Sequence, residues 1–182
     1  VIYSNSNLLA NLINDILDLS RIESGKLTLS LTKFQIKPII KRVVTSFNQQ
    51  AKSKAITINL NIPPKLSSVI ADETRLTQVL LNLVDNAIKY NKENGEIIIS
   101  AEETNSSIRI SISDNGVGIP ENDIPRLFER FYRADKGRSR EMGGTGLGLS
   151  IVKHIIQAHE GELSINSQEG FGSTFSFTIP KA

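Results

Sequence analysis

Two asparagines four residues apart, Asn82 and Asn86, stand in the otherwise apolar segment "LLNLVDNAIKYN", with Lys89 close behind. In a helix, where each residue advances by about 100°, these three side chains and Gln78 fall in one narrow stripe. Amide oxygens suit Mg²⁺, which relies on substrate phosphates, and an ammonium group one turn further on can take phosphate charge. The plain alternative is a solvated helix face, because asparagine is common on protein surfaces.

The segment "SDNGVGIP", residues 113–120, has the residue types of a pocket floor. Asp114 ends an alternating strand pattern and offers a carboxylate, while Gly116 and Gly118 let the backbone approach a flat ligand closely. Asn-Gly is also typical of a β-hairpin turn. A hairpin needs a second strand directly afterwards, and here Pro120 and a helical pattern follow, so we favour the pocket floor.

A second glycine cluster, "GGTGLGLS" at residues 143–150, runs directly into a helical pattern. Free N–H groups and the positive end of a helix are typical of a phosphate cradle. The cluster is not a P-loop, because Lys and Ser or Thr do not follow at the required spacing. It is not a dinucleotide fingerprint, because Leu149 replaces the third glycine. A flexible linker fits poorly, since the glycines alternate regularly with Leu147 and Leu149.

Between the glycine clusters lies a polar stretch, residues 132–143, with few apolar anchors. Its cations are Arg133, Lys136, Arg138 and Arg140. Long polar loops of about 12 or more residues are often lids. The segment is therefore either a solvated loop or a lid whose arginines reach a triphosphate.

Helices and strands follow one another without strict βαβ alternation, so the sequence predicts an α+β fold, a two-layer sandwich of a mixed sheet on helices. Strand patterns cover residues 27–32, 55–62, 68–71, 96–103, 107–113, 162–168 and 173–179. Helical patterns cover residues 4–24, 38–51, 73–90, 120–131 and 145–158. Asp72 is expected to cap the third of these helices. The apolar stripe of the first helix indicates one arm of a helical bundle, with docking on its own domain as the alternative.

The bulk composition excludes several classes of protein. The chain has 182 residues, 39% of them apolar, which suffices for one domain with a core plus an extra element. A net charge of +2 with scattered cations argues against nucleic acid as the main partner. Without cysteine there is no disulfide, thiolate metal site or cysteine nucleophile. No apolar run reaches the roughly 18 residues of a membrane span, and the start at Val1 indicates a piece of a longer protein, whose parent can be membrane-anchored.

Three separated segments, residues 82–89, 114–118 and 144–148, each indicate part of a nucleotide site. Together they resemble the ATP-binding domain of sensor histidine kinases, in the Bergerat or GHKL fold. "NLVDNAIKY" is similar to the N box of that family, "DNGVGI" to its G1 box, "FERF" to its F box and "GGTGLGLS" to its G2 box. The closing strand "GFGSTFSFTIP" is also similar. The resemblance covers residues 28–182, the expected catalytic ATP-binding domain. Residues 1–27, with "NLINDILDLSRIESGK", resemble the C-terminal part of the second helix of the kinase dimerisation and phosphoacceptor domain.

The resemblance implies a role for each motif. Asn82 and Asn86 would coordinate a Mg²⁺ ion that bridges the phosphates of ATP. Asp114 would accept a hydrogen bond from the adenine amino group, and Thr174 would support that contact through its hydroxyl or a water. The other residues expected to contact the nucleotide are Lys89, Tyr90, Gly116, Gly118, Ile119, Arg133, Gly144, Thr145, Gly146, Leu147 and Gly148.

Relatives that hydrolyse ATP on the same fold typically carry Glu where this chain has Asn82. A carboxylate there can act as general base on water, whereas an amide cannot take a proton at neutral pH. This difference favours transfer of the γ-phosphate to a protein side chain, in two-component signal transduction. The alternatives are a nucleotide-binding regulatory module and a weak ATPase without phosphotransfer.

The phosphate acceptor is not in this sequence. The family's acceptor lies in a His-Glu-x-Arg-Thr-Pro-like motif, and the only histidines here, His154 and His159, belong to the helix after the G2 box. We therefore expect ATP binding without autophosphorylation. The resemblance further implies a histidine-bearing dimerisation domain and a response regulator receiver domain as partners. It also implies a homodimeric parent, a fragment that can be monomeric, and a cytoplasmic location for the domain.

Overall fold

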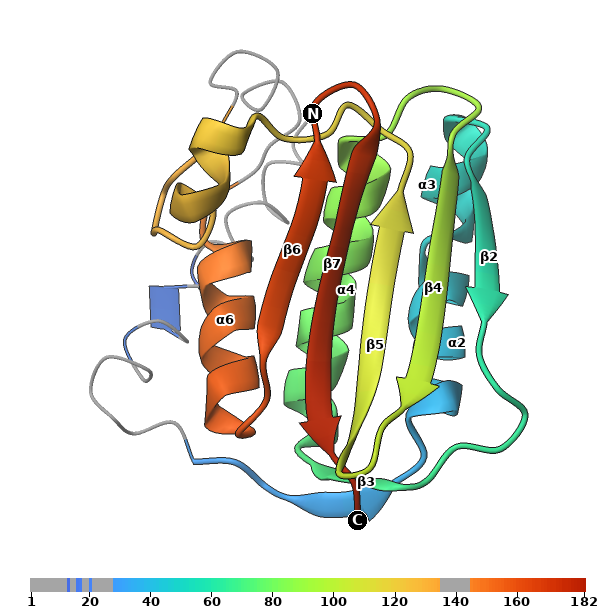
Figure 1. Cartoon of the computed structure of the whole chain (residues 1–182), viewed down its shortest axis with the longest axis vertical. Coiled ribbons are helices and arrows are strands. Elements are labelled where there is room, and N and C mark those ends of the chain that lie inside the picture. The colour runs from blue at the N-terminus through green and yellow to red at the C-terminus, as the bar shows by residue number, and fades with distance from the viewer. Residues whose placement is uncertain (1–12, 14–15, 18–19, 21–27, 135–144) are drawn as a thin grey trace.

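A mixed sheet of five strands forms one layer of the molecule, and helices cover one of its faces (Figure 1). The computed structural model describes residues 28–134 and 145–182, together with residues 13, 16, 17 and 20. In spatial order the strands are β2 (Thr57–Asn61), β4 (Glu96–Glu103), β5 (Ser107–Asp114), β7 (Gly172–Pro180) and β6 (Leu163–Gln168). Within this sheet β2 and β4 are parallel and the other neighbours antiparallel. The predicted α+β sandwich is confirmed.

The helical layer consists of α2 (Ile36–Ser46), α3 (Asn48–Ser53), α4 (Glu73–Lys89) and α6 (Gly148–Ala158). The helix α4 lies between α2 and α6 and contacts both (Figure 1). Its buried residues recur at helical spacing, and they are Leu76, Val79, Leu80, Leu83, Val84, Ala87 and Ile88. The amphipathic pattern seen in the sequence therefore fixes which face of α4 enters the core and which remains accessible.

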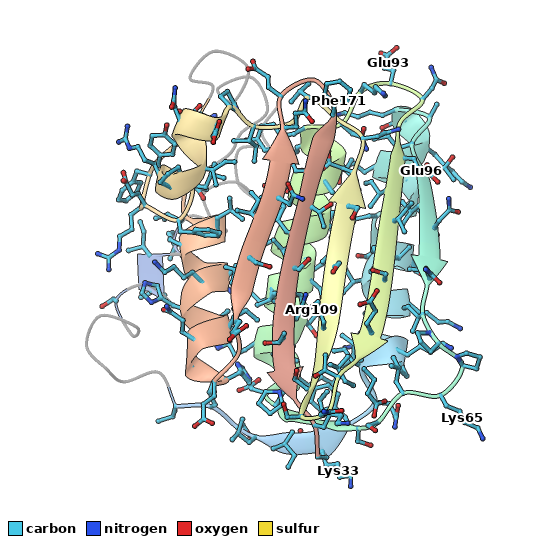
Figure 2. All side chains as sticks on the ribbon, in the orientation of Figure 1. Lys33, Lys65, Glu93, Glu96, Arg109 and Phe171 are labelled. Carbon is cyan, nitrogen blue, oxygen red and sulfur yellow. The ribbon has the colours of Figure 1, made fainter. Side chains whose placement is uncertain are left out.

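Alternation along the strands gives the sheet one apolar and one polar face. The apolar residues of β5 and β7 that are buried against the helices are Ile108, Ile110, Ile112, Phe175, Phe177 and Ile179. Figure 2 shows Arg109 on the opposite face, turned away from the helices. Because strand side chains alternate, Asp114 and Ser173 lie on the helix side, whereas Thr174 lies on the outer side.

Three predicted elements differ in the structure. The single helix predicted at residues 38–51 is divided at Phe47 into α2 and α3. In place of a strand at residues 27–32, the structure has β1 (Thr32–Phe34), which pairs with the short β3 (Val69–Ala71). Ser30 donates its N–H to the Asp72 carboxylate at 3.0 Å, so the described residues before β1 are anchored by a side chain and not by a neighbouring strand. The helix predicted at 120–131 is shortened to the 3₁₀ helix η1 (Glu121–Arg126), because Pro125 has no N–H to continue an α-helix.

The N-terminus of α4 is fixed by Asp72, as predicted. Its carboxylate accepts the N–H of Arg75 at 3.0 Å, which satisfies a free donor of the first turn. Burial acts to raise the pKa of the Asp72 carboxyl, but the backbone N–H groups of Ser30, Arg75 and Thr74 outweigh burial and lower this pKa. The Asp72 N–H is donated to Nε2 of His159, at the end of α6, at 2.9 Å. Asp72 thus joins α4 to α6 and to the chain before β1.

The helix predicted at residues 4–24 lies largely outside the described residues. Those that are described, 13, 16, 17 and 20, are helical and exposed. The other predicted strands and helices agree with the structure to within a few residues at each end. In the part of the chain that the structure describes, no helix is long and apolar enough to cross a membrane.

Candidate functional site

The polar stripe of α4 is present, as the helical spacing predicts. Asn82, Asn86 and Lys89 are partly exposed, while the neighbouring Leu83 is buried. Lys89 forms an ion pair with Asp85 through Nζ and Oδ2 at 2.5 Å, which holds the ammonium group beside the stripe. One helix face therefore presents two amides and one cation.

The first turn of α6 lies against this stripe. A Cβ on Gly148 would lie 3.2 Å from Oδ1 of Asn82, tighter than most real contacts, so glycine lets the two helices approach here. The N-cap position of α6 is taken by the buried Leu147, which offers no side-chain acceptor to the first turn. Thr145 accepts the Leu147 N–H on Oγ1 at 3.2 Å. Free N–H groups of the first turn and the positive end of a helix suit an anion, and here they lie beside Asn82.

The loop after β5 packs on the C-terminal end of α4. A Cβ on Gly116 would lie 2.3 Å from the carbonyl oxygen of Tyr90, so a larger residue does not fit. Val117 donates its N–H to the same carbonyl at 3.1 Å. Asp114 accepts the Gly116 N–H on Oδ1 at 2.9 Å. These contacts hold the Asp114 carboxylate beside the end of the helix that carries the two asparagines.

The Asp114 side chain is partly buried on the helix side of the sheet, and its carboxylate oxygens are hydrogen-bond acceptors. Burial raises the pKa of its carboxyl above the usual range, and the backbone N–H groups of Gly116 and Ser173 offset part of that effect. A carboxylate is acceptor-only, so its remaining lone pairs require N–H or O–H donors. A ligand N–H group placed here would lower the cost of burying the charge.

Ser173, not Thr174, lies beside Asp114. Ser173 pairs in register with Asp114 across β5 and β7 and is 8% exposed. Thr174 lies on the outer face of the sheet, where its Oγ1 is 2.9 Å from Oγ of Ser113. The structure thus does not bring Thr174 to Asp114, because successive strand residues point to opposite faces. Sequence reasoning missed Ser173, although the phenylalanines at every second position of β7 identify its face.

The loop continues through Gly118 and Ile119, which pack against the end of β6. Gly118 has a φ of +67°, and a Cβ there would lie 2.0 Å from the carbonyl oxygen of Gln168. Ile119 donates its N–H to Oγ of Ser167 at 2.9 Å. An open cavity of ≈ 560 Å³ lies between this loop, η1 and β6. The loop is therefore fixed on both sides, by α4 and by β6.

Phe131 and Gly146 hold together the two ends of the predicted lid. Phe131 donates its N–H to the Gly146 carbonyl at 2.9 Å, and a Cβ on Gly146 would lie 2.8 Å from the Phe131 Cα. Arg133 lies two residues after Phe131, and its buried Nε and Nη2 atoms have no hydrogen-bond partner among the described residues. Buried donors of this kind indicate a missing acceptor. Residues 135–144, with the predicted contact Gly144, lie outside the described residues.

The side chains at this site suit a cation held by amide and ligand oxygens better than a cation held by several acidic side chains. Within residues 28–134 and 145–182, no three His, Cys, Asp or Glu side chains are grouped to hold a metal ion. A divalent ion at the α4 stripe would depend on amide oxygens and on oxygens of the ligand, as Mg²⁺ does with phosphates. Close packing brings the stripe together with the first turn of α6, and direct contacts bring the C-terminal end of α4, at Tyr90, together with the loop after β5.

Comparison with known proteins places these features in a family. The model of the family described as histidine kinase-, DNA gyrase B-, and HSP90-like ATPase matches residues 71–182. Sensor histidine kinase WalK of Bacillus subtilis is 39% identical over 171 residues, which cover 93% of this chain and 28% of WalK. The chain spans less than half the length of the curated relatives that it matches.

Solved histidine kinase structures have the same fold. Full-length ShkA in complex with AMPPNP is similar with a TM-score of 0.84 and 31% identity, covering 96% of this chain and 36% of that chain. Histidine kinase ThkA in complex with the response regulator protein TrrA is similar with a TM-score of 0.77 and 30% identity. That likeness covers 100% of this chain and 49% of ThkA.

Proposed function

Because this chain belongs to the family of histidine kinase-, DNA gyrase B- and HSP90-like ATPases, we propose that it binds Mg-ATP and donates the γ-phosphate to a histidine of a dimerisation domain. The observation that carries the proposal is the contact between Gly148, in the first turn of α6, and Asn82 on α4. This contact joins an anion site to a pair of amides. Such a pairing suits a phosphate chain whose charge is shared between a helix N-terminus and a divalent ion.

At the phosphate end, Asn82 and Asn86 would hold Mg²⁺ through their amide oxygens. When bound, Mg²⁺ neutralises phosphate charge and orients the phosphates for transfer. The residues that would surround the phosphates are Gly144, Thr145, Gly146, Leu147 and Gly148. The close approach of Gly148, on α6, to Asn82, on α4, supports this assignment.

Two cations and one phenol would complete the contacts to phosphate and ribose. The buried Nε and Nη2 of Arg133 would donate to the terminal phosphates, which would supply the acceptor that these atoms lack among the described residues. Lys89 can contact a phosphate while it remains paired with Asp85, because an ammonium group has three donors. Tyr90, directly after α4, would contact phosphate and ribose.

At the adenine end, Asp114 would accept a hydrogen bond from the amino group, which offsets the burial of its carboxylate. The backbone that would lie along the ring belongs to Gly116, Gly118 and Ile119. We assign the supporting hydroxyl to Ser173 in place of Thr174, because Ser173 faces the helices beside Asp114.

The amide of Asn82 favours transfer over hydrolysis. A carboxylate at this place could activate water as a general base, whereas an amide has no such basicity at neutral pH. Phosphoryl transfer needs mainly positioning and charge neutralisation from the protein. The chain would therefore hold ATP until an acceptor histidine is presented. A nucleotide-binding regulatory module and a weak ATPase are the alternatives.

The acceptor and the downstream partner would belong to other domains. Residues 1–27 would be the end of a dimerisation-domain helix, so the complete protein would be a homodimer with the acceptor histidine on its first helix. ThkA forms a complex with a response regulator protein, and we propose a receiver domain as the partner here too. The domain would lie in the cytoplasm, even if the complete protein is anchored in a membrane.

Replacement of Asn86 by alanine tests the metal assignment. We expect Asn86→Ala to weaken Mg²⁺-dependent ATP binding by on the order of tenfold or more, because an amide ligand is removed. Calorimetric titrations with ATP, with and without Mg²⁺, measure the effect. Asn59→Ala is the matched control, because the Asn59 amide is exposed on β2 and bonds Oε1 of Glu96 at 2.7 Å. Unchanged Mg²⁺-dependent binding in Asn86→Ala would contradict the assignment.

A further inference from the structure

We propose that Ser167, on β6, is a positioning residue that sets which purine the site accepts, by fixing the direction of the Ser173 hydroxyl. The inference rests on the proposed function, because it requires a nucleotide base beside Asp114. Ser167 and Ser173 pair in register across β6 and β7, on the side of the sheet that the helices cover. Ser167 is thus one strand removed from the base and would act through Ser173.

Three contacts meet at the Ser167 hydroxyl. Its Oγ accepts the Ile119 N–H at 2.9 Å. It donates to the carbonyl oxygen of Gly172 at 2.9 Å. It also lies 2.9 Å from Oγ of Ser173, where either atom could be the donor. A hydroxyl has one proton and two acceptor lone pairs, so these three contacts use its whole capacity.

The direction of the third bond follows from the other two. A carbonyl oxygen can only accept, so the single proton of Ser167 is committed to Gly172. The bond between the two serines is then made by the proton of Ser173. With its proton turned toward Ser167, Ser173 offers only lone pairs to a ligand.

Two acceptors therefore stand together at the adenine end of the site, Oγ of Ser173 and the Asp114 carboxylate. A 6-amino group on a purine is a donor and suits both acceptors. A 6-oxo group is itself an acceptor, and it would face lone pairs with no proton between them, which is costly in a buried site. The polarity set by Ser167 thus selects adenine over 6-oxopurines, in addition to any contact of Asp114 alone.

The test compares the affinities for ADP and IDP in the presence of Mg²⁺, because IDP carries a 6-oxo group in place of the 6-amino group. In Ser167→Ala, the proton of Ser173 loses its acceptor and becomes free to turn toward the ligand. We expect the preference for ADP over IDP to fall by about three- to tenfold, the worth of one hydrogen bond. Ser167→Thr keeps the hydroxyl and should keep the preference.

The matched control is Ser164→Ala, on the same strand but on the outer face, where Oγ of Ser164 lies 3.5 Å from the carbonyl oxygen of Ser176. This variant should bind both nucleotides as the wild type does. Equal losses of ADP and IDP affinity in Ser167→Ala would assign Ser167 a purely structural role and overturn the inference. An unchanged preference would overturn it as well.

A second variant keeps the test decisive where Ser167→Ala does not fold. Ser173→Ala removes the acceptor itself and leaves Ser167 bonded to Ile119 and Gly172, so the preference for ADP should fall here too. If it does not, the inference is wrong. Wild-type protein that binds neither nucleotide overturns the proposed function, and the inference with it. A wild type that prefers ADP, with the same preference in both serine variants, overturns the inference alone.

Discussion

Two nitrogen atoms of the Arg133 guanidinium group, Nε and Nη2, are buried without a hydrogen-bond partner among the described residues. An unsatisfied buried polar group costs about 1–3 kcal/mol, and more when it is charged. Residues that lower stability in this way are typical of functional sites, where a ligand supplies the missing partner. Arg133 is therefore expected to contribute to ATP binding and to oppose folding in the absence of ATP.

Arg133→Met separates these two contributions, because methionine keeps an extended apolar stem without the charge. We expect the melting temperature without nucleotide to be unchanged or raised. We expect the affinity for ATP to fall by on the order of tenfold, and the affinity for ADP to fall less, because the lost donors would serve the terminal phosphates. Thermal unfolding and nucleotide titrations measure both effects.

Arg109→Met is the matched control, because Arg109 stands on the outer face of the sheet, away from the site (Figure 2). It should leave ATP affinity unchanged. The account of Arg133 is wrong if Arg133→Met melts at a lower temperature and binds ATP like the wild type.

Single residues show what the sequence could and could not predict about the site. The stripe of Asn82, Asn86 and Lys89 was predictable because a helix has a fixed period, and the structure places all three on one partly exposed face. Thr174 was expected beside Asp114 from the resemblance of a whole strand, without regard to which face each residue enters. The alternation of β7 gives that position to Ser173, so the face of the strand had to be read together with its motif.

At the scale of elements, Glu103 ties the end of β4 to two other segments. Its carboxylate accepts the Oγ–H of Ser67 at 2.7 Å and the N–H of Ser67 at 3.0 Å, and it pairs with Nζ of Lys181 at 3.0 Å. The hydrogen bonds from Ser67 are the largest cause, with Lys181 after them, and together they lower the pKa of Glu103 from 4.5 to about 2. The tie joins β4 to the chain before β3 and to the residues after β7.

This lowered pKa predicts an acid-sensitive contribution to stability. A carboxyl whose pKa is lower in the folded protein stabilises the fold fully above its unfolded value and loses that effect as the pH falls through its folded value. The contribution of Glu103 should be complete above pH 4.5 and should disappear as the pH falls toward about 2. The difference in unfolding free energy between wild type and Glu103→Gln, measured in urea across this range, should shrink accordingly.

Glu93→Gln is the control for that series, because Glu93 is exposed in the turn before β4 (Figure 2). The difference in unfolding free energy between Glu93→Gln and wild type should change much less between the two ends of the pH range. A difference for Glu103→Gln that stays constant from neutral pH down to about pH 2 would show that the tie does not depend on the charge of Glu103.

The elements themselves were predictable where a long periodic pattern faced the core. The helix α4 and the strands β4 and β5 follow their apolar periods closely. The leucine alternation before β1 was misleading, because a strand also needs a partner, and the described residue Ser30 bonds the Asp72 carboxylate instead. The helix after the loop 113–120 was overestimated because Pro125 restricts it to the 3₁₀ helix η1.

At the scale of the molecule, the site is assembled from segments that are distant in the sequence. Asn82 contacts Gly148, the carbonyl of Tyr90 accepts the Val117 N–H, and Asp114 pairs with Ser173. The motifs and their order were visible in the sequence. The contacts between them were not, because they depend on how α4 and α6 pack against each other and against the sheet.

His159 fits a role in folding and not in phosphate transfer. His159 is 4% exposed, its Nδ1 lies 2.8 Å from the Ile155 carbonyl, and its Nε2 accepts the Asp72 N–H at 2.9 Å. Both ring nitrogens are thus engaged in structural hydrogen bonds, which leaves neither free to attack a phosphate. His154 lies on the same helix and is partly exposed. The proposed acceptor histidine therefore lies outside this chain, on the dimerisation domain.

The most direct test supplies that acceptor. The chain is incubated with γ-labelled ATP and Mg²⁺, alone and together with a separately purified dimerisation domain that carries the acceptor histidine, and the label on each protein is followed in time. We expect acid-labile label on the added domain, no label on this chain, and little release of free phosphate before the domain is added. Label on His154 or His159 would contradict the claim that the γ-phosphate of ATP passes from this site to a separate histidine. Rapid release of free phosphate, with no label on the added domain, would contradict it too.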